Sequence, residues 1–354
     1  MRHRIAVIPG DGIGREVVPA GIEVLEAAGR RFGISFDWQE YDWSCEVFLK
    51  TGEMMPSNGL AQLAESDGIF LGAVGFPGVP DHVSLWKLLI PIRRQFGLYA
   101  NVRPVKLFEG VDGPLKHRLP ADIDMVIVRE NCEGEYSEMG GRIYAGTEDE
   151  FALQEAVFTR RGVDRILTYA FDLAATRPRR KLTSATKSNG IIHTMPFWDE
   201  RFQEIRKRYP EVTTDQFHID ILCAHFVRNP HWFDVVVASN LFGDILSDLG
   251  PACAGSIGIA PSGNIDPTGE HPSMFEPVHG SAPDIAGKGI ANPIGQIWSG
   301  AMMLRHLGHD AAADAIEAAI AAVLRDGGPR TPDLGGQAAT RDVTAALVAA
   351  VATA

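Results

Sequence analysis

Two carboxylates four residues apart stand out in the stretch 240–250, NLFGDILSDLG. In a helix, residues at positions i and i+4 lie on the same face, so Asp244 and Asp248 would point the same way. Like charges at this spacing destabilise an isolated helix by about 0.2–0.5 kcal/mol. Such pairs also occur on solvated helix faces, but a cation between the two carboxylates gives the arrangement a reason. We therefore interpret the pair as half of a divalent metal site.

The residues ahead of the pair support this interpretation. The run Asp234 to Ala238, DVVVA, is apolar and β-branched, which is typical of a buried strand in a parallel sheet. Asn240 is well placed to cap the helix that follows. The carboxylates then lie just past a strand end, where open α/β sheets bind ligands. Oxygen ligands without a suitably spaced His or Cys favour Mg²⁺ or Mn²⁺ over zinc.

Three arginines could bind an anionic substrate. Arg93 lies in a predicted helix from Leu85 to Phe96, Arg103 in the predicted strand YANVRPVKL, and Arg129 at the end of DMVIVR. A single arginine near a strand end is more often a surface residue. A planar guanidinium, however, binds a carboxylate through two parallel hydrogen bonds, so the three together suit a substrate with two carboxylates. Arg94 receives no role, because its place next to Arg93 on a helix points it elsewhere.

Composition limits the class of protein. The chain has 354 residues, 45% hydrophobic and 22% charged, which is typical of a globular protein with two domains. A formal net charge of -12 argues against nucleic-acid or membrane-surface binding as the main task. No apolar run approaches twenty residues and the N-terminus lacks a signal-peptide core, so we expect a cytoplasmic protein. The four cysteines show no CxxC spacing, which fits a reducing compartment.

The first third of the chain predicts a βαβαβ start. The glycines of PGDGIG follow the pattern GxGxG rather than GxGxxG, which disfavours an ordinary Rossmann site. We interpret Gly10, Gly12 and Gly14 as positions where the backbone approaches a ligand closely. The predicted strands are Ile5 to Ile8, Phe36 to Tyr41 and Gly68 to Val74, and Leu60 to Ala64 is a predicted helix.

A polar, glycine-rich stretch follows Arg129 and ends at Gly141, and it predicts a protruding arm or an active-site lip. Residues 255–293 have a loop-rich sequence, and so long an irregular stretch is unusual unless it binds something. The other predicted strands are Glu155 to Arg160, Lys181 to Thr186 and the extended Gln216 to Ile219. The other predicted helices are Val163 to Thr176, His193 to Tyr209, Gln296 to Leu307, Ala311 to Asp326 and Arg341 to Ala350.

Several motifs, in order and covering nearly the whole chain, resemble the β-decarboxylating dehydrogenases, the family of isopropylmalate, isocitrate and tartrate/D-malate dehydrogenases. They are RIAVIPGDGIGREV, NVRPVKL, VIVREN, TKSN, DVVVASNLFGDILSDLG and HGSAPDIAGKGIANP. The phrases FLKTGEMMP and GVPDHVSLW most resemble the tartrate/D-malate branch. The resemblance implies an α/β, non-Rossmann fold. A discontinuous cofactor-binding domain (1–100 and 252–354) would join a central substrate, metal and dimerisation domain (101–251) with an arm at about 131–160.

The resemblance also implies a homodimer whose sites borrow residues from the second subunit. Asp244 and Asp248 would share their metal, Mn²⁺ or Mg²⁺, with Asp220 of the neighbouring chain, and the family often also uses K⁺. Lys187 from the second chain would accept the hydroxyl proton, and Tyr136 would protonate the enolate. Without the resemblance, each of these residues has an ordinary interpretation. Asp220 would be a carboxylate at the start of a helix, Lys187 a solvated charge, and Tyr136 a packing or interface residue.

The resemblance places the cofactor on HGSAPDIAG. A carboxylate at Asp284 would accept hydrogen bonds from a ribose 2′-hydroxyl and repel a 2′-phosphate, so we expect NAD rather than NADP. NADP-preferring relatives carry a basic residue here. The adenosine loop would comprise His279, Gly280, Ser281, Ala282, Asp284, Ile285 and Asn292.

Substrate choice depends on SLWKLLIPIR, where isopropylmalate dehydrogenases present a small acidic residue and leucines to an isopropyl group. Trp86 and Lys87 change this slot, while Leu88 is retained, so we expect oxidation of tartrate and D-malate. A pocket separates substrates that differ by one methylene by only about 1–3 kcal/mol, so we also expect mixed activity. The alternatives are an isopropylmalate dehydrogenase and a non-catalytic regulatory relative.

Overall fold

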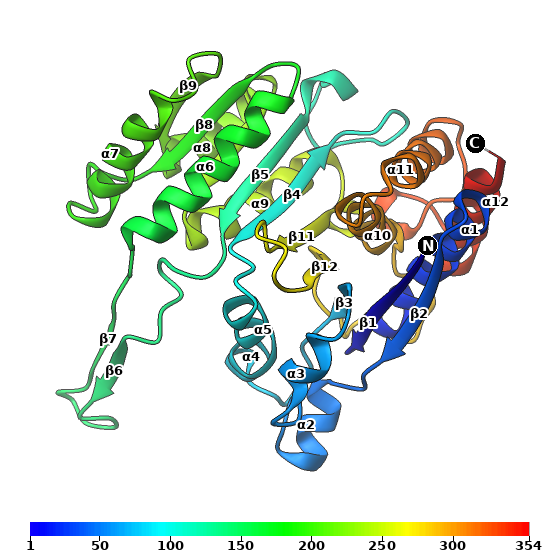
Figure 1. Ribbon diagram of the computed structural model, residues 1–354, viewed down its shortest axis with the longest axis horizontal. Helices are drawn as coiled ribbons and strands as arrows, with labels where there is room; N and C mark the ends of the chain where they lie inside the picture. The colour runs from blue at the N-terminus through cyan, green and yellow to red at the C-terminus, as the bar shows by residue number, and fades with distance from the viewer. Residues whose placement is uncertain (354) are drawn as a thin grey trace.

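The computed structural model describes residues 1–353, and ten strands form one continuous sheet in the order β2-β1-β3-β12-β11-β4-β5-β10-β8-β9 (Figure 1). Neighbours are parallel in both outer parts of the sheet, whereas β11 is antiparallel to β12 and β4, and β4 is antiparallel to β5. The strands are β1 (Arg2–Gly10), β2 (Ser35–Glu40), β3 (Gly68–Ala73), β4 (Ala100–Lys106), β5 (Asp124–Glu130), β8 (Lys181–Thr186), β9 (Thr213–His218), β10 (Val235–Ala238), β11 (Pro261–Ile265) and β12 (Ser273–Pro277).

The two ends of the chain share one half of this sheet. Strands β1, β2, β3, β11 and β12 form that half, and β4, β5, β8, β9 and β10 form the other. The halves are hydrogen bonded where β11 meets β4, with Gly263 opposite Val102. The predicted boundaries separate nearly the same two sets of strands, and the division into two domains stays a prediction.

Helices cover both faces of each half. Helices α6 and α7 lie in front of the β5–β8 half in Figure 1 and α8 and α9 behind it. The helices are α1 (Gly14–Phe32), α2 (Cys45–Thr51), α3 (Gly59–Leu63), α4 (Asp81–Ser84), α5 (Ile90–Gln95), α6 (Arg160–Thr176), α7 (Thr194–Arg206), α8 (Ile219–Arg228), α9 (Asn240–Ala254), α10 (Ile294–His306), α11 (Asp310–Arg325) and α12 (Thr340–Thr353). A π-helical turn, Leu85–Leu89, joins α4 to α5, so the predicted helix from Leu85 to Phe96 begins four residues earlier. None of the helices in the described residues has the length and apolar character needed to span a bilayer.

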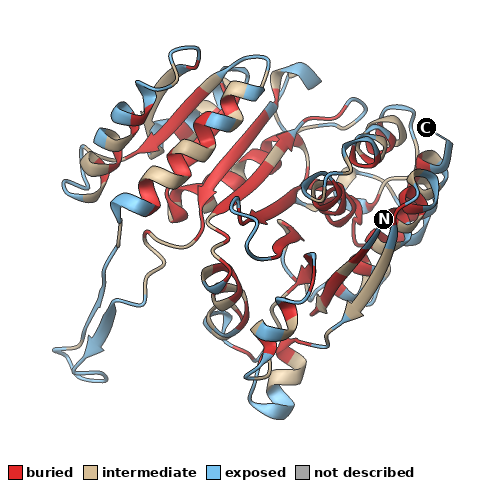
Figure 2. Ribbon diagram, in the orientation of Figure 1, coloured by how far each residue is buried: buried red, intermediate tan, exposed pale blue. Residues whose placement is uncertain are grey.

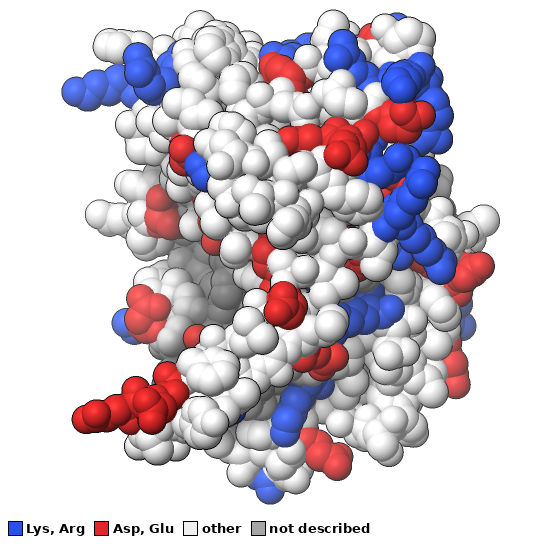
Figure 3. All heavy atoms as spheres, turned by 90° about the vertical axis from the view of Figure 1, so that its left-hand side faces the viewer, with Lys and Arg blue, Asp and Glu red and all other residues white. Residues whose placement is uncertain are grey.

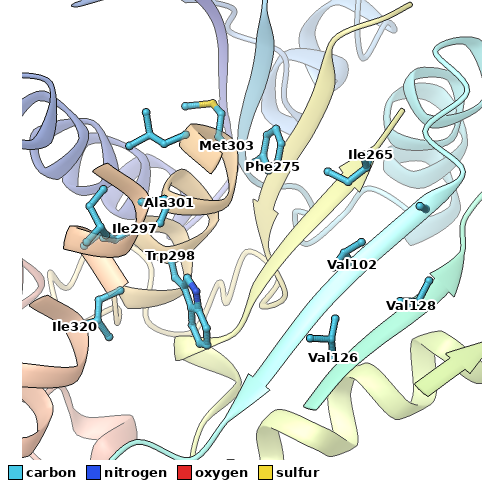
Figure 4. Packing of buried hydrophobic residues seen from close by; sticks show 14 of the residues in the cluster. Val102, Val126, Val128, Ile265, Phe275, Ile297, Trp298, Ala301, Met303 and Ile320 are labelled. Atoms are coloured by element: carbon cyan, nitrogen blue, oxygen red, sulfur yellow. The ribbon is translucent and has the colours of Figure 1, made fainter. Parts of the chain in front are cut away.

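The strands are apolar on both faces because successive side chains point to opposite faces of the sheet and helices cover each face. Met125 and Ile127 of β5 pack in the cluster that contains residues of α8 and α9, whereas Val126 and Val128 pack in the cluster with α6 and α10. The buried strands form the central band of Figure 2. Figure 4 shows Trp298 and neighbouring α10 side chains on the side of the sheet that carries Val102 and Val126.

Two sequence predictions are wrong. Residues 155–160 do not form a strand; instead β6 (Gly140–Ile143) pairs with β7 (Phe151–Gln154) in an exposed arm that projects at the lower left of Figure 1, and α6 begins at Arg160. Residues 255–293 are not only loops, because they contain β11 and β12, whose residues are all buried in the sheet. Both strands are short and contain Pro, and β11 also contains Gly, so their sequences carry little strand signal.

The glycines of PGDGIG allow close approach within the protein itself. A Cβ at Gly10 would lie 2.0 Å from the Ala73 carbonyl oxygen, one at Gly12 2.1 Å from that of Ser281, and one at Gly14 2.2 Å from that of Pro9. These glycines therefore allow close packing among β1, β3 and the loop after β12. The predicted approach of a ligand to the same backbone stays a prediction. The Asp11 carboxylate between them is fully buried and accepts backbone hydrogen bonds that include Cys45 N at 3.0 Å.

We therefore expect Gly14→Ala to destabilise the protein, because its methyl group would displace backbone of β1 and β3. Overpacking against rigid backbone should cost at least about 2 kcal/mol and lower Tm by several degrees in a thermal melt. Gly141→Ala is the matched control, since its φ is not positive and an added methyl group would meet no atom within 4 Å. A Gly14→Ala protein that melts together with the control would contradict the close approach.

Candidate active site

The start of α9 is fixed by residues that the sequence analysis did not single out. The N-cap is Ser239, not Asn240 as predicted, and its hydroxyl donates to Glu135 at 2.8 Å. Glu135 also accepts from the backbone N–H of Leu241 at 3.0 Å, so a carboxylate satisfies the positive end of the helix. Asn240 instead accepts from Arg129, whose Nη2 lies 2.6 Å from Asn240 Oδ1. Glu135 and Asn240 therefore orient the helix and one arginine together.

Asp244 and Asp248 both face arginines from the sheet. Arg129 Nη1 forms a close ion pair with Asp244, and Arg103 Nη1 lies 3.9 Å from Asp244 Oδ1 and 3.8 Å from Asp248 Oδ1. The same Arg103 nitrogen donates to Ser247 Oγ at 2.7 Å. Alternation along β4 and β5 explains this meeting, because Val105 and Ile127, which share strand faces with these arginines, pack against α9. Within one chain, the cations beside the two carboxylates are guanidinium groups.

Arg93 joins the other two arginines through a chain of buried polar side chains. Its Nη2 donates to Glu276 Oε1 at 2.8 Å, and Asn264 Nδ2 donates to the same oxygen at 2.7 Å. Asn101 Nδ2 donates to Asn264 Oδ1 at 3.0 Å, and Arg103 Nε donates to Asn101 Oδ1 at 2.8 Å. These residues are 0–7% exposed. The three predicted clamp arginines thus lie in one hydrogen-bonded network that crosses between the halves of the sheet.

Burial and charge shift the pKa values at this network in opposite directions. Burial lowers the pKa of Arg103, and it lowers the pKa of Arg129 to about 10 despite the neighbouring Asp244. Burial alone would raise the pKa of Asp244, but Arg129 and Arg103 outweigh it and hold that pKa below its ordinary value. For Asp248 burial prevails over Arg103, and its pKa lies above the ordinary value. Asp244 is therefore the more strongly anionic of the two carboxylates.

Tyr136 reaches this cluster from the base of the arm. Its hydroxyl donates to Asp244 Oδ2 at 2.8 Å, and the Arg129 guanidinium carbon lies 5.5 Å from its ring centroid. Burial and the Asp244 carboxylate raise the pKa of the phenol, which keeps it protonated and able to act as an acid. A narrow cavity of about 10 Å³ adjoins the tyrosine and is lined by Ile90, Arg93, Arg94, Asn131, Cys132, Tyr136 and Asn240.

Lys187 and Asp220 lie together. Lys187 Nζ donates to Asp220 Oδ1 at 2.7 Å, and this bond lowers the pKa of the carboxyl group. Throughout residues 1–353, no group of three or more His, Cys, Asp or Glu side chains is arranged to hold a metal ion. A site that combined Asp220 with Asp244 and Asp248 would therefore need more than one chain.

The predicted adenosine loop packs against the start of α1. Ser281 O accepts from the backbone N–H of Ile13 at 2.9 Å, and Ala282 and Ile285 pack against the buried Ile13 and Val17. Asn292 is buried and donates to Asp333 at 3.0 Å. Gly280 and Asp284 are exposed. Burial lowers the pKa of His279, whose Nε2 has no hydrogen-bond partner among the described residues.

The predicted substrate slot is only partly open. Trp86 is half-buried beneath Arg94, whose guanidinium carbon lies 5.1 Å from its ring centroid, and exposed Lys87 lies over the Phe48 ring. Leu88 is fully buried in the apolar cluster behind these residues. Its side chain supports the helix from within this cluster. The predicted contact of Leu88 with substrate stays a prediction. Figure 3 shows a hollow in the face of the molecule that lies on the left of Figure 1.

Comparisons with known proteins agree with the fold. The sequence model of the isocitrate/isopropylmalate dehydrogenase family matches residues 4–350. The D-malate dehydrogenase [decarboxylating] of Escherichia coli is 58% identical over 351 residues, 97% of each chain. The tartrate dehydrogenase/decarboxylase of Pseudomonas putida is 57% identical over 352 residues, 97% of this chain and 96% of that one.

A solved structure extends the likeness to three dimensions. The isocitrate dehydrogenase of Methylococcus capsulatus superimposes with a TM-score of 0.90 at 38% identity and covers 99% of this chain and 100% of its own. The family suggested by the sequence motifs is thus confirmed, and so is the α/β fold. The chain belongs to the isocitrate/isopropylmalate dehydrogenase family.

Proposed function

We propose that this protein oxidises 2-hydroxy diacids, with tartrate and D-malate as substrates, and decarboxylates the product, using NAD and a divalent metal ion. The observation that carries the proposal is the cluster of Arg93, Arg103 and Arg129 beside Asp244. Guanidinium groups held by buried amides can bind both carboxylates of a short diacid. The relatives named for D-malate and tartrate support this substrate class.

The donor groups fit a hard divalent cation, since Asp244 and Asp248 are partly exposed carboxylates beside the same guanidinium nitrogen. Asp220 of a second chain would complete the set. The exposed Asp284 and the loop that packs on α1 fit an adenosine ribose without a 2′-phosphate. When bound, the metal ion withdraws electron density from the C2 oxygen and NAD accepts the C2 hydride.

The side chains of the protein would move the protons. Lys187 accepts the proton of the C2 hydroxyl as the C–H bond gives up its hydride. The bond from C3 to the β-carboxylate then breaks, CO₂ leaves, and the electron pair remains as an enolate. Tyr136 donates its phenolic proton to C3, and Asp244, which accepts from the phenol at 2.8 Å, orients it. For D-malate the products are pyruvate, CO₂ and NADH, with no net release of a proton, because Lys187 accepts one proton and Tyr136 donates one.

Exposed apolar side chains support assembly into a homodimer. They lie on the arm and on α8 and α9, namely Met139, Ile143, Tyr144, Phe151, Leu153, Ile221 and Ile245, each at least 45% exposed. Large exposed apolar residues that cluster on neighbouring elements mark interaction surfaces. A second chain covering α8 and α9 would bring its Lys187 and Asp220 to this site.

A substrate panel tests the activity. With Mn²⁺ and NAD, we expect NADH formation and CO₂ release from D-malate and tartrate at rates well above those for isopropylmalate or isocitrate. Chelation with EDTA should abolish both signals, and added Mn²⁺ should restore them. Faster turnover of isopropylmalate would assign the protein to that substrate instead, and no NADH with any diacid would favour the non-catalytic alternative.

Subunit mixing tests the shared site. Lys187→Met should stop oxidation, and Tyr136→Phe should lower turnover by about 100-fold while sparing the first hydride transfer. Chains that carry the two substitutions, expressed together with different tags, should recover about a quarter of wild-type activity, because each mixed dimer contains one intact site. Isolated mixed dimers without activity would place Lys187 and Tyr136 of one site in the same chain.

Cofactor choice depends on Asp284. The wild-type protein should prefer NAD, and Asp284→Lys should shift the ratio of kcat/KM for NADP over NAD upward by at least about tenfold by removing repulsion of the 2′-phosphate. Asp284→Asn is the matched variant: it should lower kcat/KM for NAD, and it should raise kcat/KM for NADP less than Asp284→Lys does. A wild-type preference for NADP would refute this role of Asp284.

A further inference from the structure

Arg94 has no part in the clamp, yet it makes three contacts. Its Nη2 donates to the backbone carbonyl of Tyr136 at 2.6 Å, and its Nη1 lies 3.2 Å from Glu138 Oε2. Its guanidinium carbon lies 5.1 Å from the centroid of the Trp86 ring. Arg93, the preceding residue, points instead toward Glu276. Arg94 therefore joins α5 to the loop at the base of the arm.

These contacts hold Tyr136 from the side opposite its hydroxyl. The phenol is bound to Asp244 of α9 at 2.8 Å, and the backbone carbonyl of the same residue is bound to Arg94 of α5. The neighbouring residues of the loop are held by other contacts, because Gly134 pairs with Val157 and Glu135 accepts hydrogen bonds from Ser239 and from Leu241 of α9. Arg94 adds a bond to the backbone carbonyl of Tyr136 itself.

The bond to the carbonyl is the strongest of the three contacts. The Glu138 side chain is 72% exposed, so its ion pair is screened by water and contributes little. Arg94 is only 27% exposed, and a charged donor strengthens a hydrogen bond to a neutral carbonyl. The Trp86 ring supports the flat face of the guanidinium and limits its orientation. A lysine could reach the carbonyl but could not stack and fork in the same way.

We propose that Arg94, stacked on Trp86, is the positioning residue for Tyr136: it fixes the backbone of the acid so that the phenol stays on Asp244. The catalytic meaning of this role rests on the proposed function, whereas the positioning itself does not. Trp86 would then act on the reaction through Arg94 and Tyr136, in addition to any contact with substrate.

The positioning can be measured without turnover. In protein labelled with ¹³C at the tyrosine ζ carbon, the resonance missing from Tyr136→Phe identifies Tyr136, and its pH titration gives the pKa of the phenol. The charged groups that act on that phenol are Asp244, Arg129 and Glu135. Arg94→Met should release the loop, so that the phenol becomes more exposed and moves away from Asp244. The pKa of the phenol should then fall toward 10, the ordinary tyrosine value. Arg206→Met, which removes an exposed arginine at the end of α7, should leave the titration unchanged.

Kinetics of the dimeric protein with D-malate then test the consequence. Arg94→Met should lower kcat by about tenfold or more while KM changes by less than about threefold, because a small displacement of a catalytic group costs rate rather than binding. Arg94→Lys should recover part of the rate and of the titration shift. An unchanged Tyr136 titration in Arg94→Met would overturn the proposal, whatever its rate. A shifted titration in a protein that oxidises no diacid would uphold the positioning role and refute the proposed function instead.

Discussion

Three buried guanidinium groups on one face of the sheet are the constraint on which the site depends. A cation taken out of water is stable only when it is paired or fully hydrogen bonded. The three arginines, Arg93, Arg103 and Arg129, are each at most 7% exposed. Glu276 and Asp244 supply the countercharges, and Asn101, Asn240 and Ser247 accept further hydrogen bonds from Arg103 and Arg129. Arg93 Nε has no acceptor among the described residues. Removing one member of such a network would leave a buried group unpaired, so the network fixes the relative placement of β4, β5, β12, α5 and α9.

The two-residue period of a strand decides which groups enter this network. Arg129 lies on the α9 face of β5, and Glu130, one residue later, lies on the opposite face, 3.6 Å from Arg165 of α6. Burial raises the pKa of Glu130 to about 7, although the backbone N–H groups of Cys132 and Glu133 donate to it. A shift of the strand by one residue would exchange the two charges and destroy both environments. The buried apolar residues before them fix the register.

Local patterns in the sequence predicted this arrangement only in part. DMVIVR and DVVVA are continuous apolar runs, so the strands that end at the site were predictable, and so was the spacing of Asp244 and Asp248 on one helix face. Glu276 and Asn264 were missed because PSGNI and SMFEP look like loops, and their burial comes from pairing with β3 and β4. The capping role of Glu135, 106 residues before Leu241, likewise depends on contacts that no local pattern encodes.

Within one chain, arginines take the place of the cation that the sequence predicts between Asp244 and Asp248. Arg103 lies within 4 Å of both carboxylates, and Arg129 forms an ion pair with Asp244. On the proposed function, the same arginines bind substrate carboxylates and the same aspartates bind a divalent ion. An arriving diacid would take over guanidinium groups that Asp244 now occupies, and the carboxylates so released would need a new cation. Metal and substrate would therefore stabilise each other's binding, because neither can enter alone without leaving buried charge unpaired. If the proposed function holds, the ion pairs of the free protein would balance the charges of the site until both ligands arrive.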